Sequence, residues 1–239
     1  MPIALIVVAV FAAALMQSLS GFGFALIIMP LVTFGVGLQT AAPMVALTAL
    51  TVYVINVFRY RQAINLREVF CLGIGSVFGI PLGIWVLANA NEALVKQIMG
   101  LILSAYAVYA LVHPVISWVP SRGWVYPVGF LSGCLSGAYN APGPPVILYG
   151  SLSQWPRDEF RAVLQAVFLI NGALVVASHF VAHHVTVDVL MLYLCALPAL
   201  GLGILVGSRV DRRVDRNRFR TMVTALILVL GLALVLGVG

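Results

Sequence analysis

Residues 136–145 have the sequence SGAYNAPGPP, and they interrupt an apolar segment that runs from Trp124 to Ser153. Glycine frees the backbone, whereas proline removes an N–H and disfavours helix at the residue before it. The segment spans about 30 residues, which is too long for one membrane helix and too short for two. It is therefore predicted to form two half-helices separated by the break.

A second segment, Ile3 to Gly35, has the same form and is interrupted by SLSGFGF at residues 18–24. The remaining apolar runs are uninterrupted, and each is long enough to cross a hydrocarbon core of roughly 30 Å. The expected spans are residues 40–58, 69–88, 97–116, 162–181, 189–207 and 219–237.

The composition places the chain in a membrane, because 62% of its residues are apolar, only 8% are charged and the mean hydropathy is +1.10. A soluble domain carries roughly 25% charged residues. The predicted fold class is an all-α polytopic membrane protein whose residues 1–239 form one transmembrane domain in the lipid bilayer. No nucleic-acid partner is expected despite the net charge of +6, because no soluble basic domain is present to hold one.

The basic residues predict the orientation of the chain. The loops around Arg59–Arg67 and Arg209–Arg220 are the most basic, so the positive-inside rule places both in the cytoplasm. Four ordinary spans and the second broken segment separate them, so this segment must enter and leave on one face as a re-entrant hairpin. Every basic residue except Lys96 then lies inside, and both termini are predicted to lie outside.

The two halves of the chain resemble each other, since each has a broken segment followed by three spans. If the first broken segment is also re-entrant, the halves form two inverted repeats, about residues 3–116 and 124–238. Each repeat is then a broken re-entrant helical hairpin plus three transmembrane helices, an arrangement common among secondary transporters. The positions that recur at nearly constant offset are Gly21 with Gly137, Pro30 with Pro145, and Asn56 with Asn171.

The breaks predict an anion site. The half-helices that start after Gly23 and at Pro144 should point N–H groups and positive partial charge toward the membrane midplane, where an anion would bind between them. The alternative for the span amides is joining helix to helix, and the alternative for Arg161 is an interfacial arginine that snorkels. The candidate substrate-binding residues are Ser20, Gly21, Phe22, Gly23, Asn56, Tyr139, Asn140, Gly143, Pro144, Arg161, Gln165 and Asn171.

No catalytic motif is evident, because the sequence lacks Ser/His/Asp, HExxH and P-loop patterns. We expect neither enzyme activity nor a cofactor. His179, His183 and His184 have a spacing that fits a metal, but their expected place at an outer helix end favours solvated histidines, and no metal is predicted. A membrane-embedded enzyme or enzyme subunit and an anion channel remain as alternatives to a carrier.

The sequences SGFGFALIIMPLV (residues 20–32) and LSGAYNAPGPPVILYGSLSQWPRDEFRA (residues 135–162) resemble the sulfite exporter TauE/SafE family. The resemblance covers essentially the whole chain and rests on a glycine-rich break in each half, the Gly-Pro-Pro run and an arginine at position 161. It implies transport of a small sulfur-containing anion, such as sulfite, a sulfonate or a related organosulfur compound, across a bacterial-type plasma (inner) membrane. Import and export are both compatible with it. A coupling ion, H+ or Na+, and a second copy in a homodimer are further partners left open.

Overall fold

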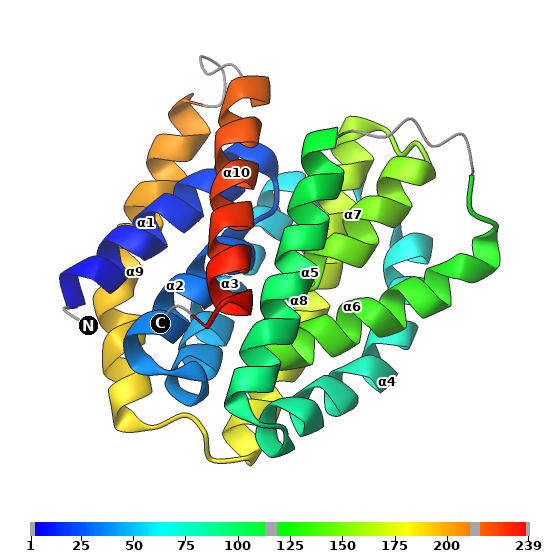
Figure 1. The fold of residues 1–239 in the computed structure, drawn as a ribbon. Helices are drawn as coiled ribbons and strands as arrows, with labels where there is room; N and C mark the ends of the chain where they lie inside the picture. The colour runs from blue at the N-terminus through cyan, green and yellow to red at the C-terminus, as the bar shows by residue number, and fades with distance from the viewer. Residues whose placement is uncertain (1–2, 113–118, 211–215, 238–239) are drawn as a thin grey trace. The chain divides into compact units, whose positions relative to one another are not determined.

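The computed structural model describes residues 3–112, 119–210 and 216–237, and within these ranges the chain is helical with no β-strand. The fold class predicted from the sequence, an all-α polytopic membrane protein, is confirmed (Figure 1). The helices are α1 (Ile3–Ser20), α2 (Phe24–Val36), α3 (Leu38–Tyr60), α4 (Leu66–Asn89), α5 (Glu92–Val112), α6 (Val125–Tyr139), α7 (Gly143–Leu152), α8 (Arg157–Val181), α9 (Val187–Val210) and α10 (Arg216–Val235), with 3-10 turns η1 (Arg61–Ala63) and η2 (Arg122–Trp124).

Within the described residues, five helices are long and apolar enough to cross a membrane: α3 with its extension through Ala63, α4, α5, α8 and α9. They correspond to five of the expected spans. Helix α5 begins at Glu92, earlier than the expected residue 97, and residues 113–116 of that expected span lie outside the described ranges. The sixth expected span corresponds to α10, whose described apolar part is Thr224–Val235.

Both predicted breaks are present. Helices α1 and α2 are separated by residues 21–23, and α6 and α7 by residues 140–142. Helix α7 begins at Gly143, one residue before the predicted start at Pro144, because proline fits the first turn of a helix, where its missing N–H costs no intrahelical bond.

The chain divides into two compact units. The first comprises Met1–Thr48, Ala90–Pro114 and His184–Gly239, and the second comprises Ala49–Asn89 and Val115–His183. Each unit therefore contains segments from both predicted repeats, so the predicted boundary near residue 120 does not separate the units.

In the second unit, α4 and α6 pack through interdigitated glycines. A Cβ added to Gly79 would lie 2.1 Å from the carbonyl oxygen of Phe130, and one added to Gly83 would lie 2.2 Å from that of Cys134. Later residues of α4 contact later residues of α6, so the two helices run parallel. Small residues spaced four apart allow such close backbone approach in membranes. The hydroxyl of Ser76 also donates across the interface to Gly129 O at 3.0 Å.

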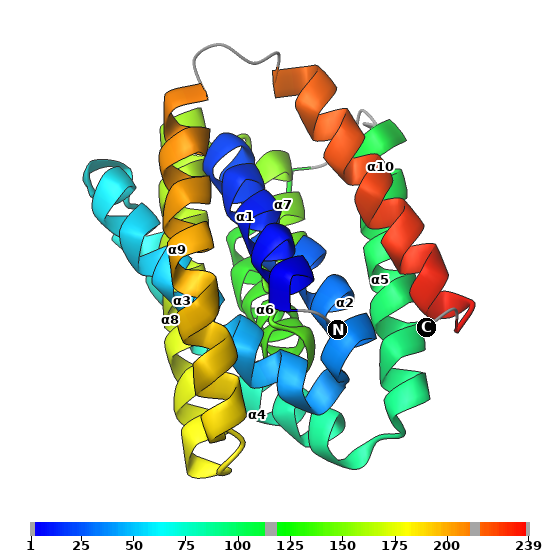
Figure 2. The same ribbon diagram turned by 90° about the vertical axis from the view of Figure 1, so that its left-hand side faces the viewer.

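In the first unit, α5 and α10 pack in opposite directions, as Figure 2 shows. A Cβ on Gly100 would meet Gly231 and Leu234, whereas one on Gly231 would meet Ser104. Later residues of α5 therefore contact earlier residues of α10, so the two helices are antiparallel. Inverted repeats require this antiparallel pairing of their last helices, and the inversion of the complete halves stays a prediction.

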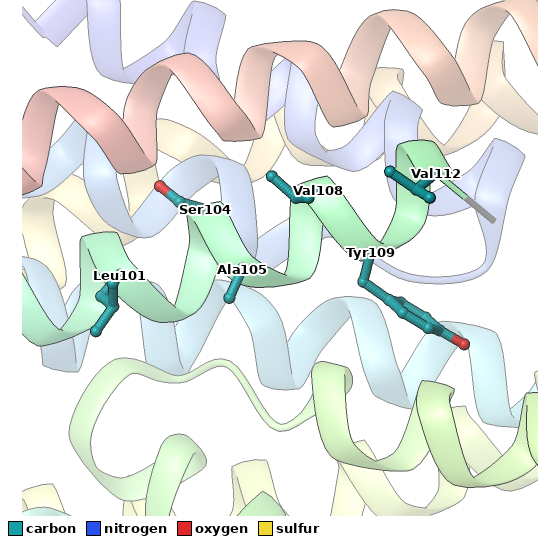
Figure 3. Close-up of a pocket in the computed structure, with 6 residues that line it drawn as sticks. All are labelled: Leu101, Ser104, Ala105, Val108, Tyr109 and Val112. Atoms are coloured by element: carbon teal, nitrogen blue, oxygen red, sulfur yellow. The ribbon is translucent and has the colours of Figure 1, made fainter. Parts of the chain in front are cut away.

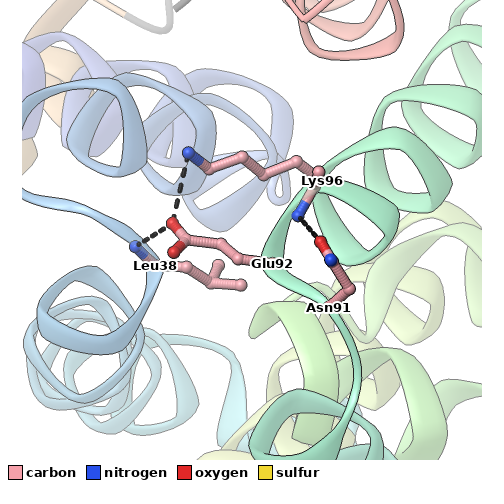
Figure 4. Close-up of polar contacts among 5 residues, drawn as sticks. Leu38, Asn91, Glu92 and Lys96 are labelled. Atoms are coloured by element: carbon pink, nitrogen blue, oxygen red, sulfur yellow. Dashed lines mark hydrogen bonds and ion pairs between the residues drawn. The ribbon is translucent and has the colours of Figure 1, made fainter.

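The start of α5 is tied to the start of α3 by one carboxylate in the first unit (Figure 4). Glu92 accepts a hydrogen bond from the backbone N–H of Leu38 at 3.3 Å and forms an ion pair with Lys96 at 3.2 Å. Asn91 accounts for the early start of α5, because its Oδ1 accepts a hydrogen bond from Ala93 N at 2.8 Å, as an N-cap does. The Glu92–Lys96 pair, one turn apart, supports the same helix end.

Candidate functional site

The first break turns the chain back on itself. The side-chain oxygen of Gln17 accepts a hydrogen bond from Phe24 N at 3.0 Å, and its Nε2 donates to Gly21 O at 3.4 Å. In a continuous helix, residues 17 and 24 would be separated by roughly 10 Å along the axis. Gly21 and Gly23 make the turn possible because their φ angles of 84° and 103° belong to the left-handed region.

The expectation of open N–H groups at the start of α2 needs a correction. The N–H of Phe24, the first of the helix, is already bound to the Gln17 side chain. Gly21, Phe22 and Gly23 are buried, and Ser20 ends α1 with a side chain outside the described part of the structure. The Phe22 ring packs edge-on against Tyr106, with ring centroids 6.4 Å apart.

The second break is closed by capping bonds. Tyr139 ends α6, and Asn140 adopts a left-handed φ of 54°, which asparagine tolerates better than most residues. The N–H of Asn140 donates to Ser136 O at 2.9 Å, and the N–H of Ala141 donates to Leu135 O at 3.2 Å. These bonds occupy carbonyls that a helix end otherwise leaves without partners. Both Tyr139 and Asn140 are buried.

A short chain of hydrogen bonds connects this break to α6 and α8. The hydroxyl of Ser132 donates to Pro142 O at 2.8 Å, and Asn171 Nδ2 donates to Ser132 Oγ at 3.2 Å. Residues 132 and 142 would be separated by roughly 15 Å along a continuous helix. The chain therefore folds back at the break, as a hairpin requires, while the re-entrant path through a membrane stays a prediction.

The start of α7 lies against α8. A Cβ on Gly143 would be 3.5 Å from Phe168 Cζ. Pro144 and Pro145 carry no N–H, so this helix end offers fewer donors than predicted. The positive end of the helix dipole remains, because it arises from all the aligned peptide groups of the helix.

Helices α3 and α8 run antiparallel in the second unit, as their side-chain contacts show. The Arg161 guanidinium carbon lies 5.9 Å from the centre of the Tyr60 ring, and the Tyr53 and Phe168 ring centroids are 5.3 Å apart. The later residue of α8 thus contacts the earlier residue of α3. The turn η1, which follows Tyr60, also packs on α8.

This register places Asn56 opposite Gln165, midway between the two aromatic contacts. On α3, Asn56 lies one turn from both Tyr60 and Tyr53. On α8, Gln165 lies one turn after Arg161 and one turn before Phe168. Each amide is therefore on the side of its helix that faces the other helix. Asn56 is 2% exposed and Gln165 is fully buried. Among the described residues, Asn56 Nδ2 has no hydrogen-bond partner.

Most candidate residues belong to the second unit: Asn56, Tyr139, Asn140, Gly143, Pro144, Arg161, Gln165 and Asn171. Residues 20–23 belong to the first unit. The structure brings Asn56 toward Gln165, and Asn171 to the second break. Three further residues take part that the candidate set omitted: Gln17, Tyr60 and Ser132. A lone serine or tyrosine in an apolar helix carries no sequence signal of its partner, so only the fold identifies them.

Two further features of the described residues are candidate sites, a groove along α5 and the three histidines. A groove of about 540 Å³ runs along α5 (Figure 3), and its lining is almost entirely apolar: Leu101, Ser104, Ala105, Val108, Tyr109 and Val112. His179 is buried in α8, whereas His183 and His184 are exposed. Within the described ranges, no group of three or more His, Cys, Asp or Glu residues is placed to hold a metal.

Comparison with known proteins agrees with this helical architecture. The model of the family described as "Sulfite exporter TauE/SafE" matches residues 5–234. The chain belongs to the sulfite exporter TauE/SafE family. No solved structure matches the chain.

Two curated proteins are similar to this TauE/SafE member. One is the "Probable sulfite/organosulfonate exporter TauE" of Cupriavidus necator, 26% identical over 92% of this chain and 88% of that protein. The other is the "Probable inner membrane transporter protein TsaS" of Comamonas testosteroni, 24% identical over 72% of this chain and 74% of that protein. The family and both names are those of transporters, so the TauE/SafE member described here is a membrane transporter rather than a member of an enzyme family.

Proposed function

We propose that this TauE/SafE protein is a secondary carrier of a small sulfur-containing anion, such as sulfite or a short sulfonate, in a bacterial-type inner membrane. The printed names of its relatives, a sulfite/organosulfonate exporter and an inner membrane transporter, support the substrate class and the membrane. The two breaks support a carrier, because irregular backbone at membrane depth is tolerated where it is buried in protein or lines a wet cavity.

One observation carries the proposal: among the residues that the structure describes, the buried Asn56 Nδ2 is a hydrogen-bond donor without an acceptor. An unsatisfied buried donor costs about 1–3 kcal/mol. An anionic oxygen would supply the missing acceptor through a charge-assisted bond. Gln165, opposite Asn56, adds a second carboxamide, and Arg161 lies one turn away on the same face of α8.

The chemistry of this face suits release as well as binding. Carboxamides and a helix dipole hold an anion without a buried full positive charge, so binding need not be too tight for transport. Arg161 is half-buried and is held beside Tyr60, where it can attract an anion toward the amides. The positive end of α7, which contacts the adjacent Phe168, adds favourable potential for the same charge.

Asn56→Leu tests this function because leucine has a similar size and lacks the donor. We expect anion affinity to fall about 10-fold or more, since a hydrogen bond to a charged group contributes about 1.5–3 kcal/mol. The free protein should be as stable as the wild type or more stable, because an unpaired donor has been removed. Thermal shift with sulfite and short sulfonates measures binding, and uptake into proteoliposomes measures flux.

Thr48→Val is the matched control, since Thr48 is buried on the same helix and its hydroxyl bonds the α3 carbonyls of Met44 and Val45 at 3.0 Å. It should leave anion affinity unchanged. Loss of stability without loss of affinity in Asn56→Leu would show that Asn56 merely joins helices and would overturn the proposal. Flux that does not saturate with sulfite would instead identify a channel.

A further inference from the structure

Two guanidinium groups lie over one aromatic ring at the end of the α3–α8 face. The guanidinium carbon of Arg59 is 5.5 Å from the centre of the Tyr60 ring, and that of Arg161 is 5.9 Å from the same centre. Both distances fall within the roughly 6 Å over which a ring face attracts a cation. Arg59 is exposed, whereas Tyr60 and Arg161 are half-buried, so this end of the face is open to solvent. One ring thus holds two positive charges that come from two different helices.

This pair of charges suits an oxyanion. Two guanidinium groups held near one ring repel each other, and a negative charge bound beside them reduces that repulsion. The planar fork of arginine donates two parallel hydrogen bonds to an oxyanion and keeps its charge at any physiological pH. Sulfite and sulfonates each present three oxygens to such donors.

The Tyr60 ring also lies next to the proposed anion site. Asn56 precedes Tyr60 by one turn on α3, and Gln165 follows Arg161 by one turn on α8. The two amides therefore lie about 6 Å further along the helix axes, on the same facing sides. An anion released by the arginines has only this short distance to travel to reach the unpaired donor of Asn56.

Beyond the amides, the same face is closed by aromatic packing. The Tyr53 and Phe168 rings are buried, and their centroids are 5.3 Å apart. A Cβ added to Gly172 would lie 3.3 Å from Tyr53 Cδ2, so the backbone of α8 packs closely against this ring. An anion that moves along this face to the amides therefore arrives from the end that carries Tyr60.

We propose that Arg59 and Arg161, positioned by Tyr60, form a capture site that binds the sulfite or sulfonate group before it reaches Asn56. The guanidinium groups bind the oxygens, and Tyr60 is a positioning residue that holds both groups in place. The turn after Tyr60 is predicted to be cytoplasmic, so capture takes place on that side. Delivery to Asn56 rests on the proposed function, whereas binding of an oxyanion by the two arginines does not.

The test measures how fast phenylglyoxal, a reagent selective for arginine, modifies each arginine of the purified full-length chain, with peptide mass spectrometry as the readout. The probe is sodium methanesulfonate, a short sulfonate that, unlike sulfite, does not add to the carbonyl groups of the reagent. Sodium chloride at the same concentration is the reference. Methanesulfonate at about ten times its Kd should slow the modification of Arg59 and Arg161 about 10-fold, because only the unbound fraction reacts.

Arg61 is the control within the same sample, since it is an exposed arginine two residues after Arg59 and outside the capture site. Its rate of modification should be the same in both salts. Tyr60→Phe keeps the ring and should keep the protection, whereas Tyr60→Leu should lose most of it at both arginines. Equal rates in the two salts at Arg59 and Arg161 would overturn the capture site. Equal slowing at Arg61, which screening by salt alone produces, would do so too, as would full protection in Tyr60→Leu.

Asn56→Leu separates the capture site from the proposed function. Protection of Arg59 and Arg161 should persist in this variant, because the capture site does not include Asn56. Wild-type affinity and flux in Asn56→Leu, together with protected arginines, would remove the proposed function and keep the capture site. A loss of affinity in Asn56→Leu, together with unprotected arginines in the wild type, would keep the function and remove the capture site.

Discussion

Asn140 has a backbone role that the structure shows and a ligand role that stays a prediction. Its φ of 54° and the bond from its N–H to Ser136 O make it the cap that ends α6. Its proposed role in anion binding concerns the side chain, which is buried. An alanine substitution confuses the two roles, because alanine resists the left-handed conformation and also lacks the carboxamide.

Asn140→Gly separates these roles. Glycine adopts a positive φ readily, so we expect a melting temperature close to that of the wild type, with anion affinity lower by about 10-fold from the lost polar contact. Asn140→Ala should lose the same affinity and, in addition, about 1 kcal/mol of stability through backbone strain. Thermal unfolding with and without sulfite measures both quantities. Wild-type affinity in the glycine variant would leave Asn140 as a cap alone.

At the scale of elements, the α4–α6 pair depends on the absence of side chains. Backbone atoms of α6 occupy the place where a Cβ of Gly79 would be, at 2.1 Å from Phe130 O and 2.8 Å from Cys134 N. Neither atom belongs to a flexible side chain, so the helices themselves must separate. This pair includes α6, which leads into the second break, so the glycine contacts also fix the position of Tyr139 and Asn140.

Gly79→Ala should therefore destabilise the protein by about 1–3 kcal/mol or more, as overpacking does. Gly201→Ala on α9 is the control, because a Cβ there meets nothing within 4 Å. It should raise stability by about 0.5–1 kcal/mol through helix propensity. Thermal melts of both variants in the same detergent give the comparison. Similar effects of the two substitutions would contradict the tight α4–α6 interface.

The sequence predicts where helices and breaks lie better than it predicts which helices pack against each other. Glycine and proline chemistry locates both breaks and most spans, because these effects act within a few residues of the chain. The glycine stripe of α4 indicates a close contact, but a stripe does not name the helix it meets. Likewise, Gln17 is recognisable as polar, whereas its bond to Phe24 N depends on a turn whose direction the local sequence does not encode. The amide atoms of Asn56 and Asn171 that lack a partner among the described residues are evident only from the packed structure.

At the scale of the whole chain, each compact unit combines helices from both predicted halves. Helix α1 packs on α9 in the first unit, and α6 packs on α4 in the second. Under the predicted repeat, α1 corresponds to α6 and α9 to α4. Each broken segment is thus held by a span from the other half, so neither predicted half would be a self-sufficient unit.

The position of the end of α10 follows from packing in the first unit. Gly100, one turn after Lys96, faces Leu234 near the end of α10, so the end of α10 lies beside the start of α5. Lys96 is the one basic residue predicted to lie outside, and α10 begins at Arg216, beside the most basic loop, whose residues 211–215 lie outside the described ranges. Packing therefore places the end of α10, at Val235, on the side of Lys96.

We expect a C-terminal alkaline phosphatase fusion to be active and a C-terminal green fluorescent protein fusion to be dark, because only the former matures outside the inner membrane. Fusions after Gln62, in the exposed turn between α3 and α4, should behave in the opposite way, since Arg59, Arg61 and Arg67 place that turn inside by the positive-inside rule.

A bright C-terminal fusion together with a bright fusion after Gln62 would put both on one side. Between Gln62 and the C-terminus lie α4, α5, α8, α9 and α10, an odd number of crossings, so that result would require the second broken segment to cross once and would exclude a re-entrant hairpin.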